Sequence, residues 1–192
     1  MDSQPNHRIL IVDDNRAIQT DFRRVLGVSP TAGLDQVEAS LFGTPSTPVP
    51  AAHCYELTFA TQGSEAVEAV EAALLVNKPF ALAFVDMRMP PGYDGLETIT
   101  RLWKLDPHLN VAICTAYSDR SWDQIIGRLG QSDQLLIVKK PFDIAEVSQV
   151  AFVMTRTWNA RRTLELQMKS MLEQAEQRAR QVRSAHLSTQ AA

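Results

Sequence analysis

The chain has 192 residues, of which 45% are hydrophobic and 21% are charged, and this composition excludes collagen-like, acidic disordered and disulfide-framework proteins. Its 19 basic and 22 acidic residues give a net charge of −3, so no general positive field is present to bind nucleic acid directly. The polar segment 1–8 does not read as a signal peptide, and no apolar run approaches the ~20 residues that span a bilayer, so we expect a cytoplasmic protein without membrane insertion.

The first part of the chain is predicted to form two strands and two helices. The unbroken apolar run 9–12 is typical of a strand buried on both faces, whereas 55–59 alternates and indicates an edge strand. Helical patterns cover 15–27 and 63–76, and residues 63–65 offer the second helix an amino-terminal cap. This helix carries one apolar stripe, made of Ala66, Val67, Val70, Ala73 and Leu74.

Residues 29–52 interrupt the alternation between the first helix and the edge strand. This segment contains one short helical candidate, Leu34–Phe42. Turn-forming residues surround it, namely Pro30, Gly33, Gly43, Pro45, Pro48 and Pro50. We interpret 29–52 as an insertion that lengthens the connection, because connections of this length are uncommon in compact domains.

Three further apolar runs follow, at 80–85, 111–114 and 135–138, and they also have the character of strands buried on both faces. Helical patterns at 94–104 and 120–129 lie between them. Strand and helix thus alternate five times, and right-handed crossovers convert this order into a parallel sheet between two layers of helices. We predict an α/β fold in which the carboxyl ends of the strands meet at one crevice.

The carboxyl-terminal part of the chain contains neither Pro nor Gly after Asp143, which predicts a single long helix. Apolar residues recur along it with the spacing of a coiled coil, namely Val147, Val150, Met154, Leu164, Met168, Met171, Ala175 and Val182. We expect a parallel homodimer through residues 147–182, or a linker, since an isolated helix is marginally stable. Arg161 falls on the same seam and weakens the coiled coil.

Polar side chains stand where the predicted buried strands end. Asp13 and Asp14 follow the first strand, and Asp86 ends the run 80–85. Thr115 and Lys140 follow the last two strands. Carboxylates that meet at one sheet edge repel each other unless a hard divalent cation such as Mg²⁺ lies among them. A carboxylate beside that cation can attack a phosphoryl group, so the pattern predicts an aspartyl phosphate.

The motifs around these residues resemble the receiver domain of two-component response regulators. They are Ile11-Val12-Asp13-Asp14-Asn15, Phe84-Val85-Asp86-Met87-Arg88-Met89-Pro90, Asp94-Gly95, Cys114-Thr115-Ala116 and Lys140-Pro141-Phe142. The resemblance implies a flavodoxin-like parallel sheet of five strands in the order 2-1-3-4-5. It assigns 7–158 to a receiver domain, with 1–6 as a flexible amino terminus and 159–192 as an extended helix.

The resemblance also implies a role for each site residue. Asp86 would be the phosphoacceptor, and Thr115 and Lys140 would contact the phosphoryl oxygens. Four groups would hold Mg²⁺, namely the side chains of Asp13, Asp14 and Asp86 and the backbone carbonyl of Arg88. The phosphoryl donor would be a sensor histidine kinase or a phosphotransfer protein.

Two features depart from the common receiver pattern. The turn 89–95 is one residue longer than the usual Met-Pro-x-x-Asp-Gly. Ile137 stands where many receivers have a switching aromatic, which leaves Tyr117 as the nearby aromatic candidate. Together with the insertion, these features resemble a subgroup of receivers found in multi-domain signalling proteins.

Three functions are compatible with the site residues. The leading one is a response regulator receiver that accepts a phosphoryl group and signals through its terminal helix, without being a turnover enzyme. A Mg²⁺-dependent phosphohydrolase is the second, but haloacid-dehalogenase-like enzymes carry a second acid two residues after the nucleophile, where this chain has Arg88. The third is a degenerate receiver that serves only as a dimerisation module, and the complete residue set argues against it.

Overall fold

The computed structural model describes residues 4–27, 55–116 and 122–190. The predicted insertion with its short helix and the switching candidate Tyr117 lie outside these described residues. The chain separates into two compact units, Met1–Trp158 and Asn159–Ala192. The sheet and all site residues belong to the first unit.

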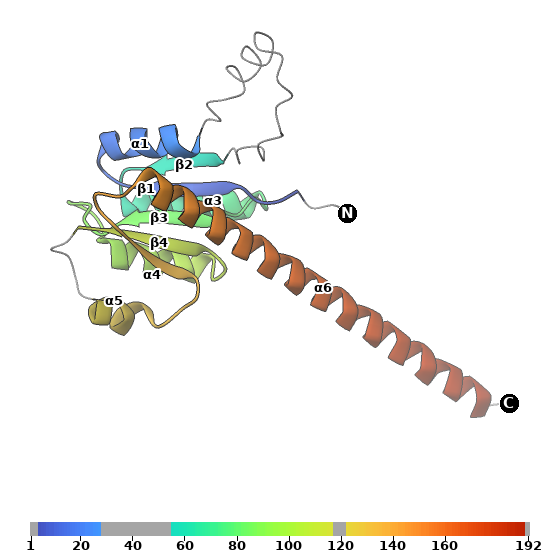
Figure 1. Ribbon diagram of the computed structural model, residues 1–192. Helices are drawn as coiled ribbons and strands as arrows, with labels where there is room; N and C mark the ends of the chain where they lie inside the picture. The colour runs from blue at the N-terminus through green and yellow to red at the C-terminus, as the bar shows by residue number, and fades with distance from the viewer. Residues whose placement is uncertain (1–3, 28–54, 117–121, 191–192) are drawn as a thin grey trace, which may run out of the picture. The chain divides into compact units, whose positions relative to one another are not determined.

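A five-stranded parallel sheet forms the centre of the first unit (Figure 1). Its strands are β1 (Arg8–Val12), β2 (Glu56–Ala60), β3 (Leu82–Asp86), β4 (Asn110–Thr115) and β5 (Leu135–Lys139). Their order is β2-β1-β3-β4-β5, so the predicted flavodoxin-like fold is confirmed. The alternating segment forms the edge strand β2, as predicted, and the carboxyl ends of all strands point to one edge of the sheet.

At the opposite edge of the sheet, formed by β5, the predicted burial is wrong. The apolar run 135–138 was expected to be buried on both faces, but β5 is the second edge strand and Leu136 is 38% exposed. A strand at the edge has a neighbour on one side only, so the helices that cover the central strands leave part of it open. An unbroken apolar run therefore does not by itself place a strand in the middle of a sheet.

Helices cover both faces of the sheet, and their bounds are α1 (Arg16–Leu26), α3 (Gly63–Leu75), α4 (Gly95–Leu105), α5 (Trp122–Leu129) and α6 (Ile144–Gln190). Asn15 caps α1 by accepting a hydrogen bond from the Ala17 N–H, and Asp94 caps α4 in the same way through the Glu97 N–H. The core has two parts, one between the sheet and α3, α4 and α5, the other between the sheet, α1 and the start of α6.

The start of α3 differs from the prediction. Gly63 is the first helical residue rather than part of a cap, and the preceding Gln62 makes no capping bond with its side chain. Instead, the Glu65 carboxylate accepts hydrogen bonds from the backbone N–H and the hydroxyl of Thr61. These bonds hold the pKa of Glu65 below its usual value. Of the predicted apolar stripe, Ala66, Val70 and Ala73 are buried, whereas Leu74 is exposed.

The first turns of α6 belong to the core of the first unit. Val147 and Met154 are 1% and 3% exposed and pack with Phe22 and Phe84. The buried Asn110 side chain also donates a hydrogen bond to the Met154 carbonyl at 2.7 Å. These residues cannot serve a coiled coil as well, so the predicted seam from 147 onward is wrong in its first two turns. None of the described helices is long and apolar enough to span a membrane.

Candidate functional site

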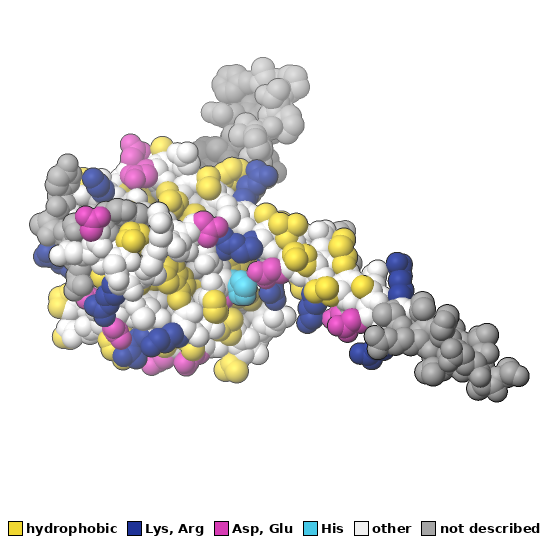
Figure 2. Space-filling view, turned by 90° about the horizontal axis from the view of Figure 1, so that it is seen from below, with side chains coloured by type: hydrophobic (Ala, Val, Ile, Leu, Met, Phe, Trp, Pro, Cys, Tyr) yellow, Lys and Arg dark blue, Asp and Glu magenta, His cyan; other side chains and the backbone are white. Residues whose placement is uncertain are grey.

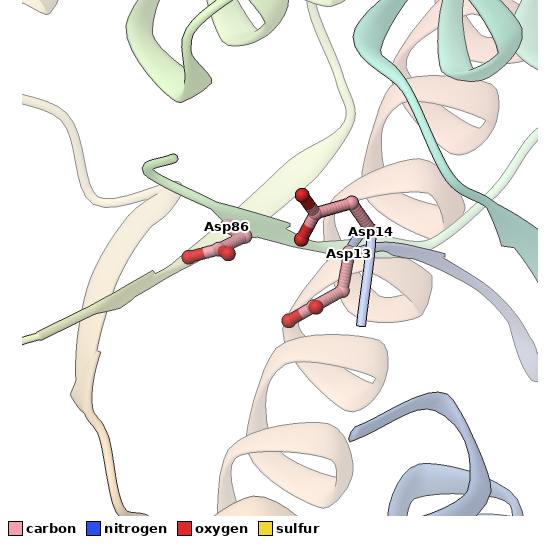
Figure 3. A group of neighbouring side chains, drawn as sticks. All are labelled: Asp13, Asp14 and Asp86. Atoms are coloured by element: carbon pink, nitrogen blue, oxygen red, sulfur yellow. The ribbon is translucent and has the colours of Figure 1, made fainter. Parts of the chain in front are cut away.

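Three carboxylates meet at the carboxyl edge of the sheet (Figure 3). Asp13 and Asp14 follow β1 directly, and Asp86 is the last residue of the neighbouring β3. One oxygen of each carboxylate lies within 4.8 Å of the others. Asp13 is buried, Asp86 is partly buried and Asp14 is exposed. The fold therefore brings together the three acids that were predicted to do so.

Lys140 closes this cluster from the other side. Its Nζ lies 2.7 Å from Asp13 Oδ2 and 3.1 Å from Asp86 Oδ1. Its backbone N–H donates to the Thr115 carbonyl, which places the residue directly after β5 at the same edge. Burial alone would lower the pKa of Lys140, but the hydrogen bonds and charges of the two aspartates raise it above the usual value. Lys140 is therefore positively charged at neutral pH.

Asp86 has the opposite electrostatic character. Its burial raises the pKa above the ordinary value, the nearby Lys140 lowers it, and the negative charge of Asp13 raises it again. The net shift is upward, so the charged form of this carboxyl group is less favourable than it is in water. A further positive charge beside Asp86 would relieve this cost.

The loop after Asp86 is fitted tightly to the strand end. The Arg88 backbone N–H donates a hydrogen bond to the Asp86 carboxylate. A Cβ at Gly95 would lie 2.5 Å from the Asp86 carbonyl oxygen and 2.8 Å from Met87 Cα, so a glycine is required there. This contact gives a physical reason for the Asp94-Gly95 pair. The predicted use of the Arg88 carbonyl as a metal ligand stays a prediction.

Thr115 lies at the same edge, as the last residue of β4. Asp86, the last residue of β3, pairs in register with Cys114, so Thr115 lies one residue beyond the end of β3. Its hydroxyl donates to the Ala116 carbonyl at 3.1 Å. A contact from Thr115 to a phosphoryl oxygen stays a prediction. Burial raises the pKa of Cys114 far above its usual value, so this thiol remains protonated.

Sequence reasoning missed the residues that orient Asp13. The Asn15 backbone N–H donates to Asp13 Oδ1 at 2.9 Å, and Gln19 Nε2 donates to the Asp13 carbonyl at 2.7 Å. Asn15 could have been found, because a helix cap directly after an acidic pair turns its own N–H toward that pair. Gln19 carries no such signal, since a glutamine in the second turn of a helix is common.

The acidic cluster fits a magnesium ion. Its donors are carboxylate oxygens, which Mg²⁺ prefers, and they come close enough to share one cation. Burial raises the pKa of Asp86, and the negative charge of Asp13 adds to this effect, so a cation held among the three carboxylates would offset their repulsion. The side chains that would hold the ion are Asp13, Asp14 and Asp86.

Comparison with known proteins agrees with this arrangement. The model of the response regulator receiver domain family matches residues 51–152, which include Asp86, Thr115 and Lys140. Sporulation initiation phosphotransferase F of Bacillus subtilis (strain 168) is 34% identical over 87 residues, which cover 45% of this chain and 67% of the relative. Asp13 and Asp14 precede the matched family range, and the fold brings them to Asp86.

Solved structures share the fold at lower identity. A CheY-like receiver domain protein of Methanospirillum hungatei JF-1 aligns with 80% of this chain and 97% of its own, at 21% identity and a TM-score of 0.56. An adenylate cyclase of Rhodopirellula baltica aligns with 85% of this chain and 98% of its own, at 21% identity and a TM-score of 0.61. The fold is that of a receiver domain. The chain belongs to the response regulator receiver domain family.

Proposed function

We propose that the protein accepts a phosphoryl group on Asp86, and that it does so in the cytoplasm as part of a two-component phosphorelay. The observation that carries the proposal is the position of Asp86, which lies beside two further carboxylates and 3.1 Å from the Lys140 ammonium. A nucleophile, a set of metal ligands and a cation for the phosphoryl oxygens are thereby combined at one sheet edge.

The reaction follows from the chemistry of the carboxylate. One Asp86 oxygen attacks phosphorus and forms the new P–O bond, while the bond from phosphorus to the donor atom breaks. A donor phosphohistidine leaves as imidazole, which keeps the electron pair of the broken P–N bond and takes a proton from water. Lys140 offsets the negative charge of the phosphoryl oxygens. Bound Mg²⁺ would supply further positive charge to those oxygens.

The donor we propose is a sensor histidine kinase or a phosphotransfer protein. The relative from Bacillus subtilis is named a phosphotransferase, which supports this class of partner. We further propose that the chain is an acceptor rather than a turnover enzyme. Arg88 occupies the position where a phosphohydrolase of the aspartyl-phosphate type needs an acid, and its side chain is exposed.

Incubation with acetyl phosphate and Mg²⁺ tests this function. We expect one phosphoryl group per chain by intact mass, and no uptake when EDTA removes the metal, because the acidic cluster then lacks its counter-charge. Continuous release of inorganic phosphate in excess over protein would instead indicate the phosphohydrolase. A chain that takes up nothing would be a degenerate receiver.

We propose that the second unit, Asn159–Ala192, carries the output by pairing with the same helix of a second copy. Leu164, Met168 and Met171 are all exposed and follow the 4-3 spacing of a coiled-coil seam. Leu166 and Leu172 are also exposed but lie off this seam. A parallel homodimer would bury the seam residues, which the isolated helix leaves in water.

A single charged residue on the seam should separate the dimer. We expect the parent chain to sediment as a dimer at micromolar concentration and Met168→Glu to sediment as a monomer, because the glutamate would be buried without a partner. Leu166→Glu is the matched control, since Leu166 is equally apolar and exposed but off the seam, and it should remain a dimer. If all three proteins are monomers, the helix is a linker.

A further inference from the structure

Two loops meet beside the acidic cluster, and a glutamine joins them. Thr61 and Gln62 follow β2, and the turn 89–92 belongs to the loop after β3. Gln62 Nε2 donates a hydrogen bond to the Pro90 carbonyl at 3.3 Å. Gln62 Oε1 is buried and has no hydrogen-bond donor in the described part of the chain. The amide cannot be the other way round, because its oxygen would then face the carbonyl oxygen of Pro90.

The turn is shaped to receive this amide. A Cβ at Gly92 would lie 2.6 Å from Gln62 Oε1 and 3.7 Å from Gln62 Cδ, and the next atom is at 4.0 Å. The backbone of Gly92 is outside the left-handed region, so its conformation does not demand glycine. A Cβ at Gly92 would therefore displace the end of the Gln62 side chain, which shows that the two residues are in contact.

The turn that Gln62 contacts lies close to Asp86 in the chain. The turn begins directly after Arg88, whose backbone N–H donates to the Asp86 carboxylate. The far end of the same loop is held independently, because Asp94 caps α4 and the Tyr93 ring lies 4.1 Å under the Arg101 guanidinium. At the near end of the loop, Gln62 donates its hydrogen bond to the Pro90 carbonyl.

We propose that Gln62 is a positioning residue for phosphoryl acceptance, and that it acts by holding the turn 89–92 so that the Arg88 backbone stays in place beside Asp86. The proposal rests on the proposed function for its effect on uptake. The statement that Gln62 holds the turn, and through it the Arg88 backbone, does not depend on that function.

The first test replaces the amide without changing the length of the side chain. In Gln62→Met, we expect phosphoryl uptake from acetyl phosphate at saturating Mg²⁺ to slow by about threefold to tenfold, which is the loss of one modest hydrogen bond. We expect the Arg88 backbone amide resonance to shift in the metal-free protein. Ser64→Ala is the matched control, because Ser64 is exposed on the same loop-helix junction, and it should change neither quantity.

The second test uses the shape of the contact. Gly92→Ala should shift the Arg88 resonance and slow uptake, because its methyl group displaces Gln62 Oε1. In the Gln62→Ala background, Gln62 Oε1 is absent, so Gly92→Ala should have no further effect on the resonance or on uptake. The effects of the two substitutions are therefore expected to be non-additive.

Each outcome decides one statement. The role of Gln62 is overturned if Gln62→Met and Gln62→Ala have the same Arg88 resonance and the same uptake rate as Ser64→Ala. It is also overturned if the effects of Gln62→Ala and Gly92→Ala are strictly additive. A parent chain that takes up no phosphoryl group overturns the proposed function instead, and the resonance of Arg88 still decides whether Gln62 holds the turn.

Discussion

Asp86→Asn is expected to abolish phosphoryl uptake and to raise the melting temperature of the metal-free protein. The amide has the shape of the carboxyl group but cannot attack phosphorus. Burial raises the pKa of Asp86 in the folded chain, so the folded parent releases a proton when it unfolds. The free energy of unfolding of the parent therefore falls as the pH rises from about 4, the ordinary pKa of an aspartate, to the higher pKa of the folded chain. At neutral pH the asparagine variant is free of this cost.

The measurement combines intact mass after acetyl phosphate treatment with thermal unfolding in EDTA. Asp133→Asn serves as a control, because Asp133 is an exposed acid in the same domain, and it should keep full uptake. Labelling of Asp86→Asn at the parent level would place the acceptor elsewhere. A lower melting temperature of this variant would mean that the Lys140 contact outweighs the burial of the charge.

The sheet could be predicted from the sequence because each strand and helix has a local signature. Unbroken apolar runs marked the strands, and the alternation of 55–59 marked the edge strand β2. Exposure of Leu136 could not be predicted, since it depends on which helices reach over β5. The same limit applies to α6, where one heptad pattern covers residues that pack into the core, such as Met154, and residues that are exposed, such as Met168.

The candidate site was predictable to the extent that topology determines it. Parallel strands bring their carboxyl ends to one edge, so Asp13, Asp86 and Lys140 had to lie near each other once the strands were identified. Gln62 was not predictable, because its role depends on the path of a loop 28 residues further along the chain. The resemblance implied that Lys140 contacts the phosphoryl group, and in the structure it is bound to two of the carboxylates that would hold the metal.

Because Lys140 contacts two carboxylates, we expect its replacement to have a large effect on stability. Lys140→Met is expected to lower the free energy of unfolding of the metal-free protein by about 3 kcal/mol, since the buried Asp13 then loses its cationic partner. In a domain of this size, such a loss lowers the melting temperature by about 6–12 °C. Mg²⁺ should restore more stability to the variant than it adds to the parent, because it replaces the missing positive charge. Phosphoryl uptake should still be slow, because the ammonium that would offset the phosphoryl charge is absent.

The pH dependence of the stability difference between the parent and Lys140→Met distinguishes the loss of a charge interaction from a packing defect. The pKa of Lys140 is raised in the folded chain, so its stabilisation is complete below the ordinary value of 10.5 and is lost only as the pH rises through the higher folded value. At the acid end, protonation of Asp86 removes one partner of the ammonium, and the stability difference between parent and variant shrinks as the pH falls through the raised pKa of Asp86. Thermal unfolding of Lys140→Met between pH 4 and 9 measures this, with Lys139→Met as the control because Lys139 is the exposed neighbour. A variant that is as stable as this control at pH 7 would show that the ammonium does not hold the acidic cluster together.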